Sequence, residues 1–243
     1  MRYRLVHGAP KNAPQPLAWA KREGLPMEDS RWNSEAGCLN GSPLCRVRRV
    51  LKRDPIRGQV EEALAAQKIH LGRKLGCGTF GCAYLRRDYP QQVVKVTGDP
   101  SEVAAAERVI AARKHGHKLP GVVKFYRVFA VRDSDLCIVI QERLSPLREN
   151  EYAMVEEQHH RIYNLGSGNN EAAQRKMAKK IGEHYGVNPS EVYSLIRVFP
   201  ELRGVGVEYH DLHEGNVLRT SSGHLKVIDL GISRSGNVKV REV

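Results

Sequence analysis

The sequence predicts a mixed α+β protein in which a strand-rich segment precedes a helix-rich one. Short apolar runs separated by turn residues occupy residues 69–96 and 122–140, as expected for a sheet of short strands. Helix-start signals at Asp99 and Asn188 are each followed by apolar residues at helical spacing. The composition, 41% apolar and 27% charged, is that of a globular protein and excludes a disordered, collagen-like or coiled-coil chain.

The expected strands are short and are separated by polar or glycine-rich turns. They are Ile69–Leu75, Ala83–Leu85, Gln92–Val96, Val122–Val131 and Leu136–Ile140. Near the end of the sequence, two further runs flank a Thr-Ser-Ser-Gly turn at 220–223 and predict a hairpin; they are Asn216–Arg219 and Leu225–Ile228.

The expected helices carry their own start signals. Residues 99–102 read Asp-Pro-Ser-Glu and residues 188–191 read Asn-Pro-Ser-Glu, which places an N-cap, a proline at N1 and a glutamate at N3 in each helix. Further helices are expected over 149–165 and 171–185, and a short one over 59–67. The order of these elements predicts two lobes, of which the first is rich in strands.

Residues 1 to about 65 are expected to form an N-terminal extension. In its first part, prolines interrupt every stretch in which residues could repeat at helical or strand spacing. The extension is partly irregular and carries a dense basic cluster: Arg46, Arg48, Arg49, Lys52, Arg53 and Arg57. Within a chain of net charge +12, this cluster is either a solvated face, a partner-docking face or a polyanion site. No aromatic residue interleaves with it to stack on nucleic-acid bases.

The five cysteines include no CxxC pair, which predicts neither a zinc knuckle nor a disulfide framework. Such sparse cysteine indicates a reducing cytoplasm. No run approaches 18 uncharged apolar residues, and no secretory signal is present, so neither a membrane partner nor export is expected.

Residues 75–83 read Leu-Gly-Cys-Gly-Thr-Phe-Gly-Cys-Ala and lie between two expected strands. A dinucleotide-binding fingerprint would be followed by a helix, so this segment is interpreted as a glycine-rich hairpin. Such a hairpin can lay its backbone N–H groups over the phosphates of a nucleotide, although an ordinary β-turn has the same composition.

Lys95 lies inside the apolar run Val93–Val96, where an unpaired ammonium group would be costly to bury. Two interpretations are open: an edge strand with Lys95 in solvent, or a buried ion pair. Glu107 falls on the apolar stripe of the following helix, whereas Glu102 is assigned to the helix cap. We therefore expect a buried Lys95–Glu107 pair.

Three oxygen-bearing side chains are expected to meet near the end of the sequence. Asp211 and Asn216 lie in one polar loop, and Asp229 follows the apolar run 225–228. Carboxylate and amide oxygens suit Mg²⁺, which completes its shell with phosphate oxygens. His210 and His213 lie nearby, but the hard oxygen donors argue against zinc.

Taken in order, these motifs resemble those of the protein-kinase superfamily. They comprise a G-x-G-x-F-G loop, a strand lysine, a helix glutamate, a D-x-x-x-x-N loop and an Asp-Leu-Gly where the family has Asp-Phe-Gly. The resemblance covers roughly Ile69 to Ser233. It implies a bilobal protein kinase-like fold over 66–243, with a β-rich N-lobe (about 66–144) and a shortened helical C-lobe (about 145–243).

The resemblance also implies a role for single residues. The glycine-rich loop would cover the phosphates of ATP through Leu75, Gly76, Gly78, Phe80, Gly81 and Ala83. Lys95, paired to Glu107, would hold the α- and β-phosphates, and Glu142 would begin the hinge against which adenine docks. Asp211 would accept the proton of the acceptor hydroxyl. Asn216 and Asp229 would hold Mg²⁺.

The sequence departs from the family pattern at two places. Tyr209-His210-Asp211 stands where protein kinases read His-Arg-Asp, so the arginine that binds a phosphorylated activation loop is missing. Fourteen residues, 230–243, follow Asp229, and no Ala-Pro-Glu motif appears among them. In both respects the chain resembles the minimal kinases of bacterial effectors and phages.

We therefore expect a constitutively competent kinase that transfers phosphate from ATP to Ser or Thr of an unidentified protein. Its expected location is the cytoplasm; for a phage or effector protein, this would be the cytoplasm of the host cell. One alternative is a small-molecule kinase, since Asp-Leu-His-Glu-Gly-Asn resembles the loop of aminoglycoside phosphotransferases. Phe80 in the glycine-rich loop argues against it. The other alternative is a catalytically inactive binding module, which the presence of Lys95, Asp211, Asn216 and Asp229 disfavours.

Overall fold

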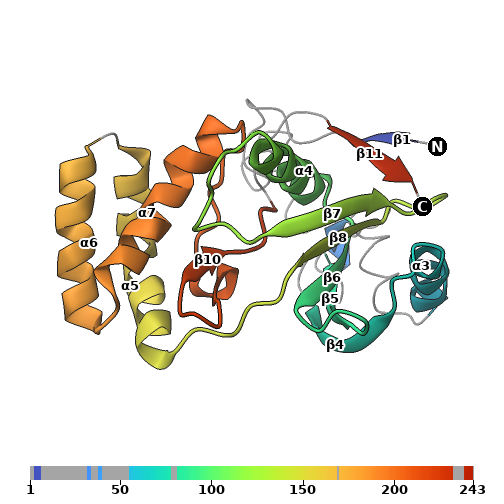
Figure 1. Ribbon diagram of the computed structural model, residues 1–243, viewed down its shortest axis with the longest axis horizontal. Helices are drawn as coiled ribbons and strands as arrows, with labels where there is room; N and C mark the ends of the chain where they lie inside the picture. The colour runs from blue at the N-terminus through green and yellow to red at the C-terminus, as the bar shows by residue number, and fades with distance from the viewer. Residues whose placement is uncertain are drawn as a thin grey trace.

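The computed structural model describes residues 3–6, 32–33, 38–39, 55–77, 81–168, 170–231 and 238–242. Within these ranges the chain has five α-helices and a mostly antiparallel sheet, so the predicted mixed α+β class is confirmed. Figure 1 shows the sheet on one side of the molecule and three helices grouped on the other. These three helices are α5 (Glu149–Ser167), α6 (Glu171–Tyr185) and α7 (Pro189–Gly204).

The main sheet has seven strands in the order β1-β11-β7-β8-β6-β5-β4. They are β1 (Tyr3–Val6), β4 (Leu71–Cys77), β5 (Gly81–Arg86), β6 (Gln92–Thr97), β7 (Phe125–Ala130), β8 (Cys137–Glu142) and β11 (Val238–Glu242). Neighbouring strands are antiparallel except β11 and β7, which are parallel. The five expected strands are confirmed with shifted ends, whereas β1 and β11 are additional.

Two smaller sheets complete the strands of the described ranges. One is the hairpin of β9 (Val217–Arg219) and β10 (Leu225–Val227), which confirms the expected hairpin and follows a short 3₁₀ turn, η1 (Glu214–Asn216). The other pairs β2 (Trp32–Asn33) with β3 (Cys38–Leu39).

The two faces of the main sheet pack into different cores, because successive side chains of a strand point to opposite faces. Val94 and Val96 of β6 belong to a core that includes Val60 and Leu64 of α3 (Pro55–Ala65). On β8, Val139 belongs to the other core, together with residues of α4 (Pro100–Lys114). Lys95 lies between Val94 and Val96 and therefore points to the α4 face.

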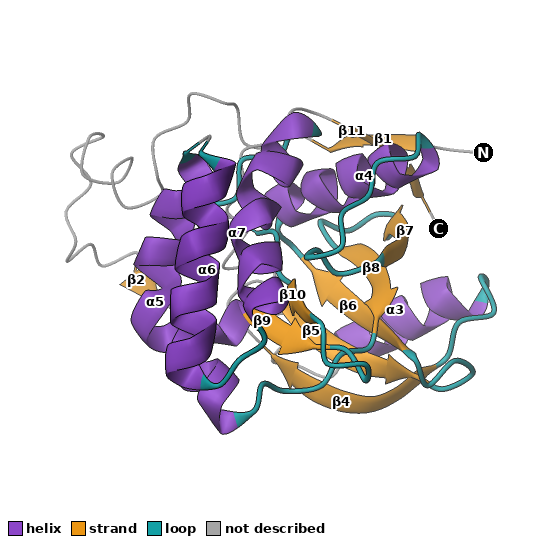
Figure 2. Ribbon diagram, turned by 60° about the vertical axis from the view of Figure 1, so that its left-hand side comes forward, coloured by secondary structure: helices purple, strands orange, loops and turns teal. Residues whose placement is uncertain are grey.

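Helix α4 begins where the sequence predicts. The Asp99 carboxylate caps it by accepting a hydrogen bond from the Ser101 backbone N–H at 2.8 Å, and Pro100 occupies the first helical position. The helix lies against the sheet (Figure 2) and is buried on most of its circumference. Three consecutive alanines, 104–106, are fully buried, and their small side chains allow this close approach to β7 and β11.

Hydrogen bonds and an ion pair join the sheet to the helical part. Ser145 and Arg219 exchange two backbone hydrogen bonds, with N···O distances of 2.7 and 2.8 Å. The backbone N–H of Val123 donates to the carbonyl of Val227 at 2.9 Å. Lys226 pairs with Glu142 at 2.6 Å. These contacts hold β10 against the sheet and so fix the chain just before Asp229.

Part of the predicted N-terminal extension packs with the sheet. Strand β1 pairs with β11, and α3 covers one sheet face, although it begins and ends earlier than the expected 59–67. Residues 46–54 of the basic cluster lie outside the described residues. None of the helices in the described ranges is long and apolar enough to cross a membrane.

Candidate active site

Lys95 lies on an interior strand of the sheet. Strand β6 pairs with β5 on one side and β8 on the other, so the interpretation as an exposed edge strand is wrong. The Lys95 side chain is 12% exposed, and its Nζ contacts two carboxylates. One is Glu102 Oε1 at 2.7 Å, and the other is Asp229 Oδ2 at 2.8 Å. The ammonium group is therefore buried with the partners that burial requires.

The expected Lys95–Glu107 pair is wrong, because Glu102 takes that position. Only Gly98 and Asp99 separate β6 from α4, so the first turn of the helix lies directly over the end of the strand. Glu102 is the third residue of that turn, and its side chain is 1% exposed. Glu107 is five residues further on, about 140° around a helix of 3.6 residues per turn. It is half-buried, and burial raises its pKa while Lys114 opposes the rise.

The charges around Lys95 are unbalanced. Burial by itself lowers the pKa of Lys95, but Glu102 and Asp229 outweigh burial and raise it above its ordinary value. Burial raises the pKa of Glu102 to about 7, with Lys95 opposing the rise and Asp229 and Asp99 adding to it. When Lys95, Glu102, Asp229 and Asp99 are all ionised, this cluster holds one positive and three negative charges.

Asp229 has a strained backbone. Its φ angle is 49°, in the left-handed region that residues with a Cβ atom rarely adopt. Its Oδ1 accepts a hydrogen bond from the backbone N–H of Gly231 at 3.3 Å, while Oδ2 faces Lys95. Strain of this kind, about 1–3 kcal/mol, is frequent at functional sites. Asp229 is thus held with its carboxylate directed at Lys95 on β6.

Asp211 and Asn216 are joined to each other and, through the backbone, to the strand that precedes Asp229. Asn216 Nδ2 donates to the Asp211 carbonyl at 2.9 Å and to Asp211 Oδ2 at 3.0 Å. The backbone N–H of Ile228 donates to the Asn216 carbonyl at 2.8 Å. Oδ1 of Asp211 accepts no hydrogen bond within the described ranges, and the side chain is 40% exposed. This oxygen can accept a hydrogen bond from a group outside the described residues.

The two residues before Asp211 are anchored differently from each other. Tyr209 is buried, which raises its pKa well above the ordinary value, and its hydroxyl donates to the Asp211 carbonyl at 2.8 Å. His210 is exposed, and its Nδ1 lies 2.9 Å from the hydroxyl of Tyr163 on α5. A cavity of about 240 Å³ opens beside them, lined by Tyr163, Ser167, Phe199, Arg203, Glu208, Tyr209 and His210.

The glycine-rich hairpin joins β4 to β5, and its base lies beside Lys95. Ala83 is opposite Lys95 in the β5–β6 register. Gly81 is buried where a Cβ atom would overlap the carbonyl oxygen of Val96, so this position requires glycine. Gly76 and Leu75 are exposed on β4. Gly78 and Phe80 lie outside the described residues.

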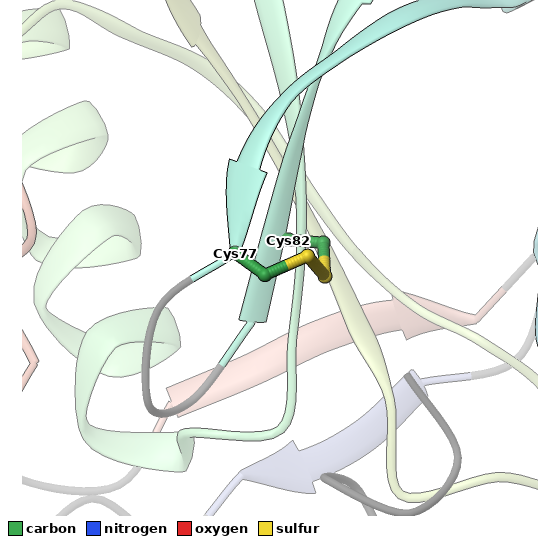
Figure 3. Close-up of a disulfide and its surroundings, with 2 residues drawn as sticks. All are labelled: Cys77 and Cys82. Carbon is green, nitrogen blue, oxygen red and sulfur yellow. A yellow bond between two sulfur atoms is a disulfide. The ribbon is translucent and has the colours of Figure 1, made fainter. Parts of the chain in front are cut away.

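The sequence predicts no disulfide framework, but two cysteines of the glycine-rich hairpin are joined to each other. Cys77 and Cys82 are opposite each other in the β4–β5 register and are joined by a disulfide (Figure 3). The pair has a spacing of five residues, which matches no cysteine motif. It is brought together only because the chain reverses between the two strands.

Glu142, the expected start of a hinge, ends β8. Its Oε1 accepts a hydrogen bond from the Lys124 backbone N–H at 2.6 Å and pairs with Lys226. Its own backbone N–H donates to the Lys124 carbonyl at 2.8 Å. The side chain thus links the sheet to the β9–β10 hairpin.

The oxygen donors of this site could hold a magnesium ion only together with ligands from outside the protein. Among the residues that the structure describes, no group of three or more His, Cys, Asp or Glu side chains is arranged to hold a metal. Asn216 and Asp229 would supply two oxygen donors. Mg²⁺ commonly binds through one or two such groups and takes its other ligands from phosphates and water.

Gly231→Ala is expected to destabilise the protein by crowding two carboxylates of this site. A Cβ atom at Gly231 would lie 2.7 Å from Asp99 Oδ2 and 2.9 Å from Asp229 Oδ1, so one carboxylate must move. Overpacking of this kind costs about 1–3 kcal/mol, which thermal unfolding would measure. Gly204→Ala is the matched control, because a Cβ there meets nothing within 4 Å. Equal melting temperatures for the two variants would contradict the packing described for Gly231.

Comparison with protein-family models and with curated proteins gives no match to this chain.

Proposed function

We propose that the chain is a minimal kinase that transfers the γ-phosphoryl group of ATP, with Mg²⁺, to a serine or threonine hydroxyl of a protein. In this proposal the fold is bilobal and kinase-like. The sheet with α3 and α4 is the N-lobe, and the helical part with the β9–β10 hairpin is a shortened C-lobe.

The observation that carries the proposal is the contact of Lys95 with both Glu102 and Asp229. These three residues come from a strand, a helix and the segment after β10, and Asp229 is more than 100 residues beyond the other two in the sequence. In protein kinases, phosphoryl transfer uses a strand lysine paired with a helix glutamate, together with an aspartate that binds Mg²⁺. The hydrogen-bonded Asp211–Asn216 pair lies next to it through the Ile228–Asn216 backbone bond.

The proposed reaction uses these residues in separate roles. Lys95 binds the α- and β-phosphates, and Glu102 keeps its ammonium group in place. Asn216 and Asp229 would hold Mg²⁺, which supplies neutralisation of the phosphate charge. Asp211 accepts the proton of the acceptor hydroxyl while the oxygen of that hydroxyl bonds to the γ-phosphorus. The bond between the γ-phosphorus and the β–γ bridging oxygen breaks, and ADP is released.

Calorimetric titration of the full chain with ATP tests the binding half of this proposal. ATP is expected to bind in the presence of Mg²⁺ and to bind more weakly in EDTA. Asp229→Asn should reduce this magnesium dependence, because it removes a metal ligand and part of the negative excess. ATP that fails to bind under either condition would contradict the proposal.

A small-molecule acceptor is the second candidate, and one observation favours it. The 240 Å³ cavity beside His210 lies next to Asp211 and combines aromatic walls with the charged residues Arg203 and Glu208. A pocket with a few polar groups among aromatic ones is typical of small-ligand sites. Transfer of label to small molecules, and not to proteins, would favour this candidate.

Phosphorylation of the enzyme itself is expected to change its rate very little. Only residues 230–237 separate Asp229 from β11, which is paired to the sheet, so a long regulatory loop has no room to fold at this point. The basic residue that would receive a phosphate is replaced by His210, which contacts Tyr163. Phosphatase-treated and untreated enzyme should have initial rates within about tenfold of each other, equivalent to roughly 1.4 kcal/mol. A Ser233→Ala/Ser235→Ala variant should also have an initial rate within about tenfold of that of the untreated enzyme. A larger loss of initial rate in either comparison would reveal a phosphorylation site that controls the enzyme.

A further inference from the structure

A pair of cysteines lies at the base of the glycine-rich hairpin, and the proposed reaction does not use it. Cys77 is the last residue of β4, and Cys82 is the second residue of β5. Their Cα atoms are 4.0 Å apart, and Figure 3 shows their sulfur atoms bonded across the hairpin. The disulfide closes a ring around residues 78–81, which include two of the glycines expected to cover phosphates.

The two cysteines differ in their access to solvent. Cys77 is exposed, whereas Cys82 is 1% exposed. A dissolved thiol would therefore approach the disulfide from the side of Cys77. Cys137 is buried on β8 and offers no comparable access.

The disulfide also lies close to the phosphate-binding lysine of the proposed site. Cys82 is opposite Val96 in the β5–β6 register, and the next residue, Ala83, is opposite Lys95. A change in the order of this end of the hairpin would therefore act where the nucleotide phosphates are expected.

We propose that Cys77–Cys82 is a reversible thiol–disulfide exchange site through which small thiols of the glutathione class control how firmly the ends of β4 and β5 are joined at the base of the glycine-rich hairpin. The effect on nucleotide binding rests on the proposed function, whereas the exchange itself does not. Disulfides in reducing compartments are commonly transient and redox-sensing. An exposed disulfide is also more labile than a buried structural one.

The exchange takes place in two balanced steps. A small-molecule thiolate attacks Cys77 Sγ, which forms a mixed disulfide and releases Cys82 as a thiolate that takes a proton from water. A second small-molecule thiolate then attacks the non-protein sulfur of the mixed disulfide. Cys77 leaves as a thiolate, and the two small molecules leave as their own disulfide. Two thiols have supplied the two electrons, and the oxidised small molecule reverses both steps.

The closed ring is expected to favour nucleotide binding. Strand ends that are already joined lose less conformational entropy when a nucleotide binds beside Lys95. The oxidised protein should therefore bind MgATP about 5- to 10-fold more tightly than the reduced protein. The Cys77→Ser/Cys82→Ser variant should resemble the reduced form in every redox buffer.

The test equilibrates the full chain in buffers of different reduced-to-oxidised glutathione ratio, alkylates free thiols and identifies the cysteine peptides by mass spectrometry. The expected result is a linked Cys77–Cys82 peptide that opens and closes reversibly, with both cysteines changing together and Cys137 reduced throughout. A pair that stays reduced in the most oxidising buffer would overturn the proposal. So would a pair that opens only in denaturant, or linkage of Cys77 to another cysteine.

Hydrogen exchange of the peptide covering residues 75–83 and MgATP titration are then measured on the oxidised and reduced forms. Faster exchange and weaker binding in the reduced form support the proposal. Equal exchange in both forms overturns the control of the hairpin, whatever the nucleotide result. If neither form binds ATP, the proposed function fails, and hydrogen exchange still decides the redox proposal.

Discussion

Asp211→Asn is expected to lower the turnover number by about 10²–10⁴-fold, the range for loss of a general base. The affinity for MgATP should change little, because Asp211 contacts neither Lys95 nor Asp229 among the interactions of the described residues. The substitution is also conservative in geometry. Asparagine keeps a carbonyl oxygen that can accept the hydrogen bond from Asn216 Nδ2, so the loop should hold its shape.

The turnover number and the dissociation constant of MgATP are to be measured on the same preparations. Asp135→Asn is the matched control, because Asp135 is an exposed residue in the turn between β7 and β8. An unchanged turnover number in Asp211→Asn would refute the assignment of the base. A loss of affinity as large as the loss of turnover would instead make Asp211 a ligand of the metal or nucleotide.

Lys95→Met is expected to lower the free energy of unfolding by about 3 kcal/mol at pH 8, because it leaves the buried Glu102 carboxylate without its cation. Adding Glu102→Gln should recover about 1 kcal/mol or more of that loss, since residues in contact do not behave additively. The pKa of Glu102 is raised to about 7 by burial. At pH 5 the carboxyl group is therefore neutral in the folded protein, and the loss caused by Lys95→Met should be smaller.

Glu107→Gln is the matched control for this cycle, because Glu107 lies on the same helix but does not contact Lys95. Its effect should add to that of Lys95→Met within about 0.5 kcal/mol. Urea unfolding in EDTA measures the three single and two double variants without relying on enzymatic activity. If Glu107→Gln, and not Glu102→Gln, recovered the stability lost in Lys95→Met, the result would contradict the observed Lys95–Glu102 pair. In the unaltered background, Glu102→Gln should lower the enzymatic activity more than Glu107→Gln does.

Helix α6 shows which parts of the fold the sequence predicts well. Its observed bounds, Glu171–Tyr185, are those expected, because both ends are set by local chemistry. The Asn170 side chain accepts a hydrogen bond from the Ala173 backbone N–H, and Gly186 adopts a left-handed conformation with a φ of 65°. By contrast, β1 and β11 become strands by pairing across almost the whole chain. Their few residues carry no local signal of that pairing.

The candidate site shows a similar division. Lys95, Asp211, Asn216 and Asp229 were identifiable from their motifs, and the structure brings them into contact or into neighbouring positions. Glu102 was missed because the capping rule offered it another role. The short link between β6 and α4, which was visible in the sequence, would have favoured it over Glu107.

The disulfide could not be found from cysteine spacing, because only the register of the β4–β5 hairpin places Cys77 opposite Cys82. Asp99 was identified as a cap, yet its Oδ2 is buried and accepts no hydrogen bond among the described residues. Its contribution to the negative excess around Lys95 depends on how Gly231 packs against it. Both features depend on tertiary contacts that no local pattern contains.

Incubation of the full chain with γ-labelled ATP and Mg²⁺, alone and with a cell lysate, tests the central claim most directly. With the unaltered chain, we expect the label on serine or threonine residues of protein bands. With Asp211→Asn, we expect no label above background. Label confined to small molecules would contradict the protein acceptor and favour the second candidate. Absence of any transfer by a chain that binds MgATP would contradict phosphoryl transfer itself and leave a nucleotide-binding module.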